Sequence, residues 1–141
     1  AARLVVAADK AVPVGEELDE RSVLLALAAT AQHAIAGGNP PDLIVGHGVL
    51  GRLLARIAVA SGAAPTVWET QPGRRDGAGG YSVVDPQDDP RRDYRSIYDV
   101  SGDSSLLDRL IACLAPGGEI VLAGFYAEPL SFASTSLGAK S

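Results

Sequence analysis

The sequence predicts an α/β protein built on a doubly wound parallel sheet of about five strands. Short apolar runs alternate with helix-like segments along most of the 141 residues. At one junction three glycines, in Gly46-His-Gly-Val-Leu-Gly51, separate a buried run from an apolar segment of helical period. Because connections between parallel strands are right-handed, the pattern predicts the strand order 3-2-1-4-5.

The first part of the chain predicts a short β segment and a helix. Two apolar runs, Leu4–Ala8 and Ala11–Val14, are split by two charged residues, as in a hairpin-like or extended start. A helix is expected over Leu18–Ala36, because its apolar residues recur at helical spacing and Gly37-Gly38 follows as a stop.

The remaining elements follow in βα order. Five strands are expected, at Leu43–Val45, Pro65–Glu69, Tyr81–Val84, Arg95–Val100 and Glu119–Gly124. Helices are expected at Val49–Ser61 and Ser104–Leu114, the second stopped by Pro116-Gly-Gly118. The polar segment 71–80 leaves room for one helical turn at most, and the loop 85–93 replaces the usual crossover helix. Residues 18–130 thus form one predicted domain, and 131–141 a flexible tail.

Composition and charge argue against several classes of function. The net charge is −5 and the arginines are scattered, so a general nucleic-acid surface is not expected. No apolar run approaches the roughly 20 residues of a membrane span. The single cysteine, Cys113, is expected in the core and suits a reducing, cytoplasmic compartment. Two distant histidines and one cysteine give no metal-ligand pattern.

The glycine turn is the main candidate site. Gly46 lets the chain turn sharply off the first strand, and Gly48 lets bare backbone approach a phosphate. Gly51 lets the helix pack closely on the sheet. The free N–H groups at the helix start, around Val49 and Leu50, would face the anion together with the positive end of the helix dipole.

An acid follows the first glycine by 23 residues, at Glu69. With Thr70 it ends the second strand, where a carboxylate can accept both adenosine-ribose hydroxyls and repel a 2′-phosphate. This position favours NAD over NADP, although a solvated strand-end acid is the simpler alternative. Arg74 and Arg75 could accommodate a phosphate, line the adenine side or face water.

Four chain segments are expected at the same edge of the sheet. They are Gly46–Gly51, Glu69-Thr70, Val100-Ser101-Gly102 and Gly124-Phe125-Tyr126. Ligands of doubly wound folds bind outside the carboxyl ends of the strands, where the strand order reverses. We therefore expect a nucleotide-type ligand there.

Several polar residues have two interpretations each. His47 could add charge beside a pyrophosphate, but a side chain pointing to solvent or to the interior is the simpler expectation. His33 is expected to be structural or exposed. Thr30 lies in an apolar helical stretch, where threonine usually bonds back to its own helix. Asp99 could be a catalytic acid or a hydrogen-bonded structural carboxylate.

These residues together resemble the medium-chain dehydrogenase/reductases. The resemblance covers roughly residues 3–130 and is carried by Leu4–Pro13, Ala29-Thr-Ala31, Leu43–Gly51, Glu69, Asp76-Gly-Ala78, Tyr98–Gly102 and Leu114–Gly124. Within that superfamily, three segments resemble the bacteriochlorophyllide dehydrogenases: Pro41–Ala55, Tyr94–Gly102 and Gly124–Phe132. Those enzymes oxidise a 3-(1-hydroxyethyl) side chain of the tetrapyrrole to 3-acetyl.

The resemblance implies a Rossmann-type NAD-binding domain and hydride transfer from a carbinol carbon to the nicotinamide. It places Thr30 against the nicotinamide, Val100 and Ser101 along the riboses, and the backbone of Gly124 and Phe125 at the carboxamide. Residues 1–17 would be a remnant of the catalytic-domain strands. The groups that activate the alcohol would lie in a separate domain, so no catalytic residue is assigned. The chain is expected to be a truncated piece, inactive alone.

Two other functions remain open at this point. A methyltransferase-like domain that binds S-adenosylmethionine also uses a glycine turn and a strand-end acid. A non-catalytic nucleotide-binding or dimerisation module is the other alternative, because an uncovered fifth strand invites pairing of two copies through the sheet edge.

Overall fold

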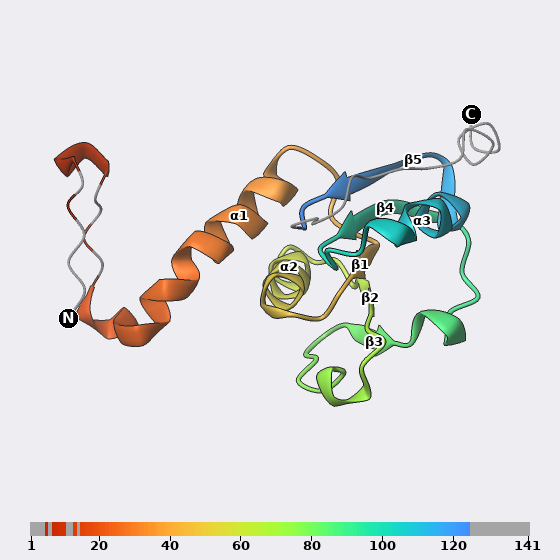
Figure 1. Cartoon of the computed structure of the whole chain (residues 1–141), viewed down its shortest axis with the longest axis horizontal. Coiled ribbons are helices and arrows are strands. Elements are labelled where there is room, and N and C mark those ends of the chain that lie inside the picture. The colour runs from red at the N-terminus through yellow and green to blue at the C-terminus, as the bar shows by residue number, and fades with distance from the viewer. Residues whose placement is uncertain (1–4, 6, 11–12, 14, 125–141) are drawn as a thin grey trace.

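The structure is a computed structural model that describes residues 5, 7–10, 13 and 15–124. Its centre is a five-stranded sheet in the order β3-β2-β1-β4-β5, with every neighbouring pair parallel (Figure 1). The strands are β1 (Leu43–Val45), β2 (Thr66–Trp68), β3 (Ser82–Val84), β4 (Tyr94–Asp99) and β5 (Leu114–Leu122). The predicted fold class and strand order are therefore confirmed.

Helices cover both faces of this sheet, as a doubly wound fold requires. The α-helices are α1 (Leu25–Ala36), α2 (Val49–Ala60) and α3 (Leu107–Cys113). Short 3-10 helices span Ala8–Lys10, Glu16–Leu24, Pro72–Arg74, Pro86–Asp88 and Ser104–Leu106. Figure 1 shows the first half of α1 leading away from the sheet, while its last turns lie near α2.

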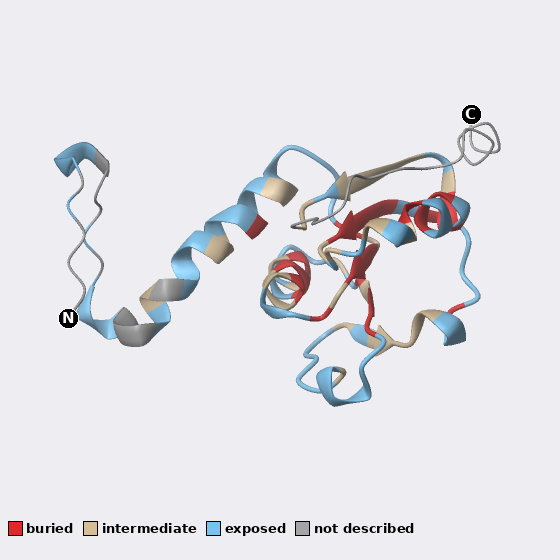
Figure 2. Cartoon of the chain, viewed as in Figure 1, coloured by how far each residue is buried: buried red, intermediate tan, exposed pale blue. Residues whose placement is uncertain are grey.

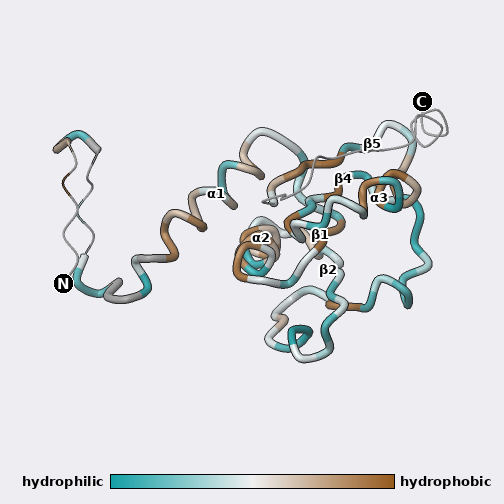
Figure 3. The backbone as a smooth tube through the Cα atoms, in the orientation of Figure 1, coloured by the Kyte–Doolittle hydropathy of each residue, from teal (hydrophilic) through white to brown (hydrophobic). Residues whose placement is uncertain are grey.

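The alternation of side chains along β1 divides the core into two layers. Leu43 and Val45 pack with Trp68 and Leu110 on the face covered by α3. Ile44 lies in the other layer, among residues of α1, α2, β2 and β4. Figure 2 shows the buried residues concentrated in the central strands and in the inner sides of α2 and α3, and Figure 3 shows hydrophobic segments in the same places. Cys113 is buried in the α3 layer, as predicted.

The first predicted helix is divided in the structure. Glu16–Leu24 forms a 3-10 helix, and only Leu25–Ala36 is α-helical. The 3-10 part carries five charged residues, and no side chain caps its start at Gly15. A short polar segment gains little helical stability without a packed face. Ala31, by contrast, is fully buried against the layer formed with Ile44, and the helix there is regular.

The fifth strand begins earlier than expected. Pro116-Gly-Gly118 was predicted to stop the preceding helix, with the strand at Glu119–Gly124, but β5 already starts at Leu114 and ends at Leu122. Its pairing with β4 shifts register between Tyr94 and Ser96, and Gly117 adopts a φ of 74°. The predicted helix stop is therefore an irregularity within the strand, which a glycine with positive φ permits.

A buried carboxylate organises the connection between β3 and β4. Asp89 accepts hydrogen bonds from Trp68 Nε1 and the Tyr94 hydroxyl, each at 2.6 Å, and from the Arg91 N–H at 3.0 Å. Burial would raise the pKa of Asp89, but these hydrogen bonds and nearby Arg92 together lower it. Burial and the bond to Asp89 raise the pKa of Tyr94 to about 12. The short Pro86–Asp88 helix confirms that a full crossover helix is missing here.

Some predictions fall on residues that the structure does not describe. Most of the two N-terminal apolar runs, Phe125 and the tail 131–141 lie outside the described residues. Within the start of the chain, Ala8–Lys10 forms one 3-10 turn where the two runs were expected to separate. Among the described residues, no helix is long and apolar enough to cross a membrane.

Candidate nucleotide-binding site

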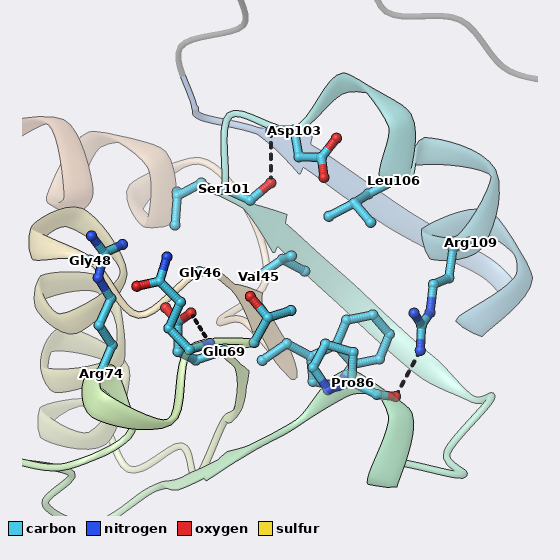
Figure 4. A pocket seen from close by; sticks show the side chains of 14 residues that line it. Val45, Gly46, Gly48, Glu69, Arg74, Pro86, Ser101, Asp103, Leu106 and Arg109 are labelled. Atoms are coloured by element: carbon cyan, nitrogen blue, oxygen red, sulfur yellow. Dashed lines mark hydrogen bonds between the residues drawn. The ribbon is translucent and has the colours of Figure 1, made fainter.

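A cavity of about 320 Å³ opens at the carboxyl ends of β1, β2 and β4 (Figure 4). This is the edge at which the sequence predicted a ligand site. Its lining residues are Val45, Gly46, Gly48, Trp68, Glu69, Thr70, Gln71, Arg74, Pro86, Val100, Ser101, Asp103, Leu106 and Arg109.

The three glycines of the turn have different surroundings. Gly46 has a φ of 107°, and a Cβ there would lie 3.2 Å from the Ser101 Cα, so both conformation and space favour glycine. A Cβ on Gly51 would lie 1.8 Å from the Gly46 carbonyl oxygen, a clash that any side chain would make at this position. A Cβ on Gly48 would meet nothing within 4 Å. Protein packing therefore explains Gly46 and Gly51, but it does not explain Gly48.

Gly48 is also the N-cap of α2, in an extended conformation and without a side-chain cap. The first N–H groups of a helix have no partner within the helix. Val49 follows Gly48 with an exposed side chain, so the start of this helix is accessible. Bare backbone, open space and the positive end of a helix meet at one point on the cavity wall.

Glu69 lies at the end of β2 and is 7% exposed. Its Oε2 accepts the His47 N–H at 3.1 Å, and its Oε1 accepts the Gln71 N–H at 2.9 Å. Each carboxylate oxygen has a second lone pair, so the group can still accept hydroxyls from a ligand. The acid is therefore a fixed part of the cavity wall, unlike the solvated acid of the simpler interpretation.

The two arginines of the segment 71–80 have different roles. Arg74 is exposed and lines the cavity with its side chain beside Glu69 in Figure 4. Arg75 donates to the carbonyls of Glu69 and Thr70, at 2.8 and 3.0 Å, and pairs with Asp85 at 2.5 Å. Only Arg74 is thus placed to meet a ligand, while Arg75 holds the loop against β2.

The loop after β4 forms the opposite wall. Ser101 lines the cavity and donates its hydroxyl to Asp99 at 2.7 Å, while its N–H bonds the same carboxylate oxygen at 3.0 Å. Asp99 is 1% exposed, which favours the structural interpretation over a catalytic acid. Asp103 also lines the cavity, and hydrogen bonds from the Ser105 hydroxyl and N–H lower its pKa.

One wall of the cavity is formed by residues that sequence reasoning missed. Trp68 lies beside Arg109, whose guanidinium carbon is 5.2 Å from the indole centroid. Arg109 also donates to the Pro86 carbonyl at 2.8 Å (Figure 4). Trp68 directly precedes the predicted site residue Glu69, and this position next to Glu69 was a signal by which Trp68 could have been predicted. No sequence pattern indicated that Arg109 of α3 and Pro86 of the crossover loop would meet there.

Other predicted site residues lie outside this cavity. The Thr30 hydroxyl donates to the Ala26 carbonyl at 2.9 Å, which matches the simpler interpretation from the residues. Gly102 and Gly124 are half-buried and do not line the cavity, and Leu50 packs on the α2 side of the core. His33 is exposed, as expected. Among the described residues, no group of three metal-ligating side chains occurs.

Comparison with known proteins identifies close relatives, although no family model matches the chain. A 2-desacetyl-2-hydroxyethyl bacteriochlorophyllide A dehydrogenase of Cereibacter sphaeroides is 61% identical over 133 residues, covering 92% of this chain and 42% of that protein. A protein of the same name from Rhodobacter capsulatus is 57% identical over 134 residues, covering 93% and 43%. The chain therefore spans less than half the length of each relative.

Solved structures share the fold at lower identity. L-idonate 5-dehydrogenase of Escherichia coli superposes with a TM-score of 0.79 at 21% identity, over 97% of this chain and 44% of that one. A short chain alcohol dehydrogenase from E. coli CFT073, complexed with NADH, gives 0.78 at 20% identity, over 96% and 45%. Over the part that it spans, the chain is similar in sequence to the bacteriochlorophyllide dehydrogenases, as predicted, and it shares its fold with dehydrogenases of solved structure.

Proposed function

We propose that this chain is the NAD-binding domain of an alcohol dehydrogenase. The observation that carries the proposal is Gly48, whose backbone faces open space at a helix start and lines the same cavity as the carboxylate of Glu69. A dinucleotide has an anionic pyrophosphate and a ribose diol, and these two groups need such a pair of partners.

Different residues of the cavity fit different parts of the NAD molecule. Gly48 and the first N–H groups of α2 would face the pyrophosphate, and Glu69 would accept the adenosine-ribose hydroxyls. The Trp68, Pro86 and Arg109 wall would border the adenosine end. Val100 and Ser101 would border the path toward the nicotinamide, whose own contacts at Thr30, Gly124 and Phe125 stay a prediction.

Bound here, NAD would supply the hydride acceptor for oxidation of a carbinol carbon in the intact enzyme, with release of the hydroxyl proton. We propose that the substrate is a bacteriochlorophyllide-type tetrapyrrole with a hydroxyethyl side chain, as the names of both relatives suggest. Its 3-(1-hydroxyethyl) group would become 3-acetyl. This chain's part would be to bind and orient the cofactor. The division into residues 1–17, 18–130 and 131–141, the cytoplasmic location and pairing of two copies through the edge of β5 stay predictions beside it.

Binding can be measured through the single tryptophan, because Trp68 lines the cavity. Titration with NADH should quench Trp68 emission and give energy transfer to the dihydronicotinamide. In a thermal-shift series with NAD, NADP and S-adenosylmethionine, NAD should stabilise most, by about 2.7 kcal/mol at a hundredfold excess over Kd. Stabilisation by S-adenosylmethionine alone would reject the proposal and favour the methyltransferase alternative.

A further inference from the structure

The imidazole of His47 connects the glycine turn to the loop that carries Arg74. The residue is 1% exposed, and its ring lies edge-on to Tyr81 with the centroids 5.6 Å apart. Nδ1 is 2.5 Å from the Arg74 carbonyl oxygen, and Nε2 is 2.9 Å from the Tyr81 hydroxyl. The side chain thus points away from the cavity and into the interior, as the simpler sequence interpretation expected.

These two contacts define the proton positions on the neutral ring. A carbonyl oxygen only accepts, so Nδ1 carries the proton and donates to Arg74. Nε2 then accepts, and the Tyr81 hydroxyl is its donor. A hydrophobic residue at position 47 would leave the half-buried Tyr81 hydroxyl without this partner and the Arg74 carbonyl with one donor fewer.

The main chain of His47 contacts the side chain of Glu69. The His47 N–H donates to Glu69 Oε2 at 3.1 Å, while the His47 carbonyl accepts from Arg52 Nε at 3.2 Å. Arg52 also donates to the carbonyls of Arg74 and Asp76, at 3.0 and 2.9 Å. One residue of the turn therefore holds Glu69 through its backbone and the Arg74 loop through its ring.

We propose that His47 is a positioning residue that sets the preference for NAD over NADP. The inference rests on the dinucleotide-binding function proposed above. With the loop held, the Gln71 N–H keeps Glu69 in place and the Arg74 guanidinium stays beside the cavity. With the loop released, Glu69 loses an ordering bond and Arg74 gains freedom to reach a 2′-phosphate. The preference for NAD over NADP, measured as the ratio of Kd for NADP to Kd for NAD, then falls.

The first measurement needs no nucleotide. Amide hydrogen exchange is followed at Arg74 and Arg75, whose N–H groups bond the carbonyls of Gln71 and Pro72. In His47→Leu these amides should exchange about tenfold faster, because loss of the tether raises local opening. Tyr81→Phe should give a smaller increase, and His47→Asn should restore protection, since its amide nitrogen can still donate to the Arg74 carbonyl. His33→Leu, at the chain's other histidine, is the exposed control.

The second measurement is the affinity of each variant for NAD and NADP by Trp68 fluorescence or calorimetry. His47→Leu should lower the ratio of Kd for NADP to Kd for NAD by at least about fivefold, roughly 1 kcal/mol. His47→Asn should recover most of that ratio, and His33→Leu should keep it. If His47 had a purely structural role, His47→Leu would weaken the binding of NAD and of NADP by the same factor, and that result would overturn the proposal.

The binding measurements separate failure of the positioning role from failure of the proposed function. If the unmodified chain binds NAD and the ratio stays constant across the His47 variants, only the positioning role falls. If the unmodified chain binds neither dinucleotide, the proposed function falls and the discrimination role falls with it. Should His47→Leu fail to fold, the same comparison is made with His47→Asn and Tyr81→Phe. Unchanged amide exchange together with an unchanged ratio of the two Kd values in Tyr81→Phe would refute the role of the His47 ring in holding the loop.

Discussion

Replacement of Gly48 by valine separates ligand binding from folding. A Cβ at this position meets no atom within 4 Å, and the backbone is extended, with φ −79° and ψ −165°. L-residues adopt that conformation without strain. We expect the free energy of unfolding of Gly48→Val to change by no more than about 1 kcal/mol, the usual cost of a poor N-cap residue.

The cost for NAD binding should be far larger. The open space beside Gly48 is where a pyrophosphate oxygen would approach the backbone, and valine would fill it with three carbon atoms. Displacement of the phosphates from the helix start would remove charge-assisted hydrogen bonds of about 1.5–3 kcal/mol each. Loss of two such bonds weakens binding by at least about a hundredfold, which corresponds to roughly 2.7 kcal/mol.

The assay combines urea unfolding with a Trp68 titration by NADH, and Gly51→Ala is the matched control. Its Cβ would lie 1.8 Å from the Gly46 carbonyl oxygen, so α2 must move away from the sheet. Such overpacking costs about 1–3 kcal/mol or more of stability. The two variants should therefore differ in kind: Gly48→Val folds and does not bind, whereas Gly51→Ala is destabilised. Equal NADH affinity in Gly48→Val and in the unmodified chain would refute the assigned phosphate position.

Three further predictions concern charge and burial. Glu69→Gln should reduce discrimination against NADP by about tenfold, roughly 1.4 kcal/mol, because repulsion of a 2′-phosphate is lost; an unchanged ratio of the two Kd values would remove that role. Asp89→Asn should lower the urea-derived free energy of unfolding by about 1–3 kcal/mol, since its buried donors lose a charged acceptor; Asp88→Asn, exposed on the same loop, is the control. The pKa of Tyr94 is raised from 10.0 to about 12, so its contribution to stability is complete below pH 10 and is lost as the pH rises to 12. Tyr94→Phe should flatten that alkaline loss, and a parallel loss in both proteins would contradict the assignment.

The sequence predicted the sheet well, because strand order follows from periodicity and from the handedness of βα connections. The glycine turn was equally readable, since each glycine had a separate physical reason. Helix ends and strand ends were less predictable. The 3-10 helix at Glu16–Leu24 and the early start of β5 at Leu114 depend on what those segments pack against. Local sequence carries little information about such packing.

Half of the cavity wall could not be predicted for a related reason. Pro86 and Arg109 lie far apart in sequence, and their contact joins the short crossover between β3 and β4 to α3. The inward orientation of His47 was expected as one alternative, but its partners Arg74 and Tyr81 were not. Contacts between loops require the tertiary structure, whereas contacts within one βα unit follow from spacing.

The carboxylate of Asp89 has a consequence for how mutations combine in this protein. It joins Trp68 of the cavity wall, Tyr94 of β4 and the backbone of the crossover loop through one group. Substitutions at these positions share that partner, so their effects should not add. Once Asp89 is replaced, Tyr94→Phe should cost much less than it does in the unmodified chain. Substitutions in the crossover loop and at Trp68 are therefore expected to be coupled. A substitution in the loop should change how much stability a substitution of Trp68 in the cavity wall costs.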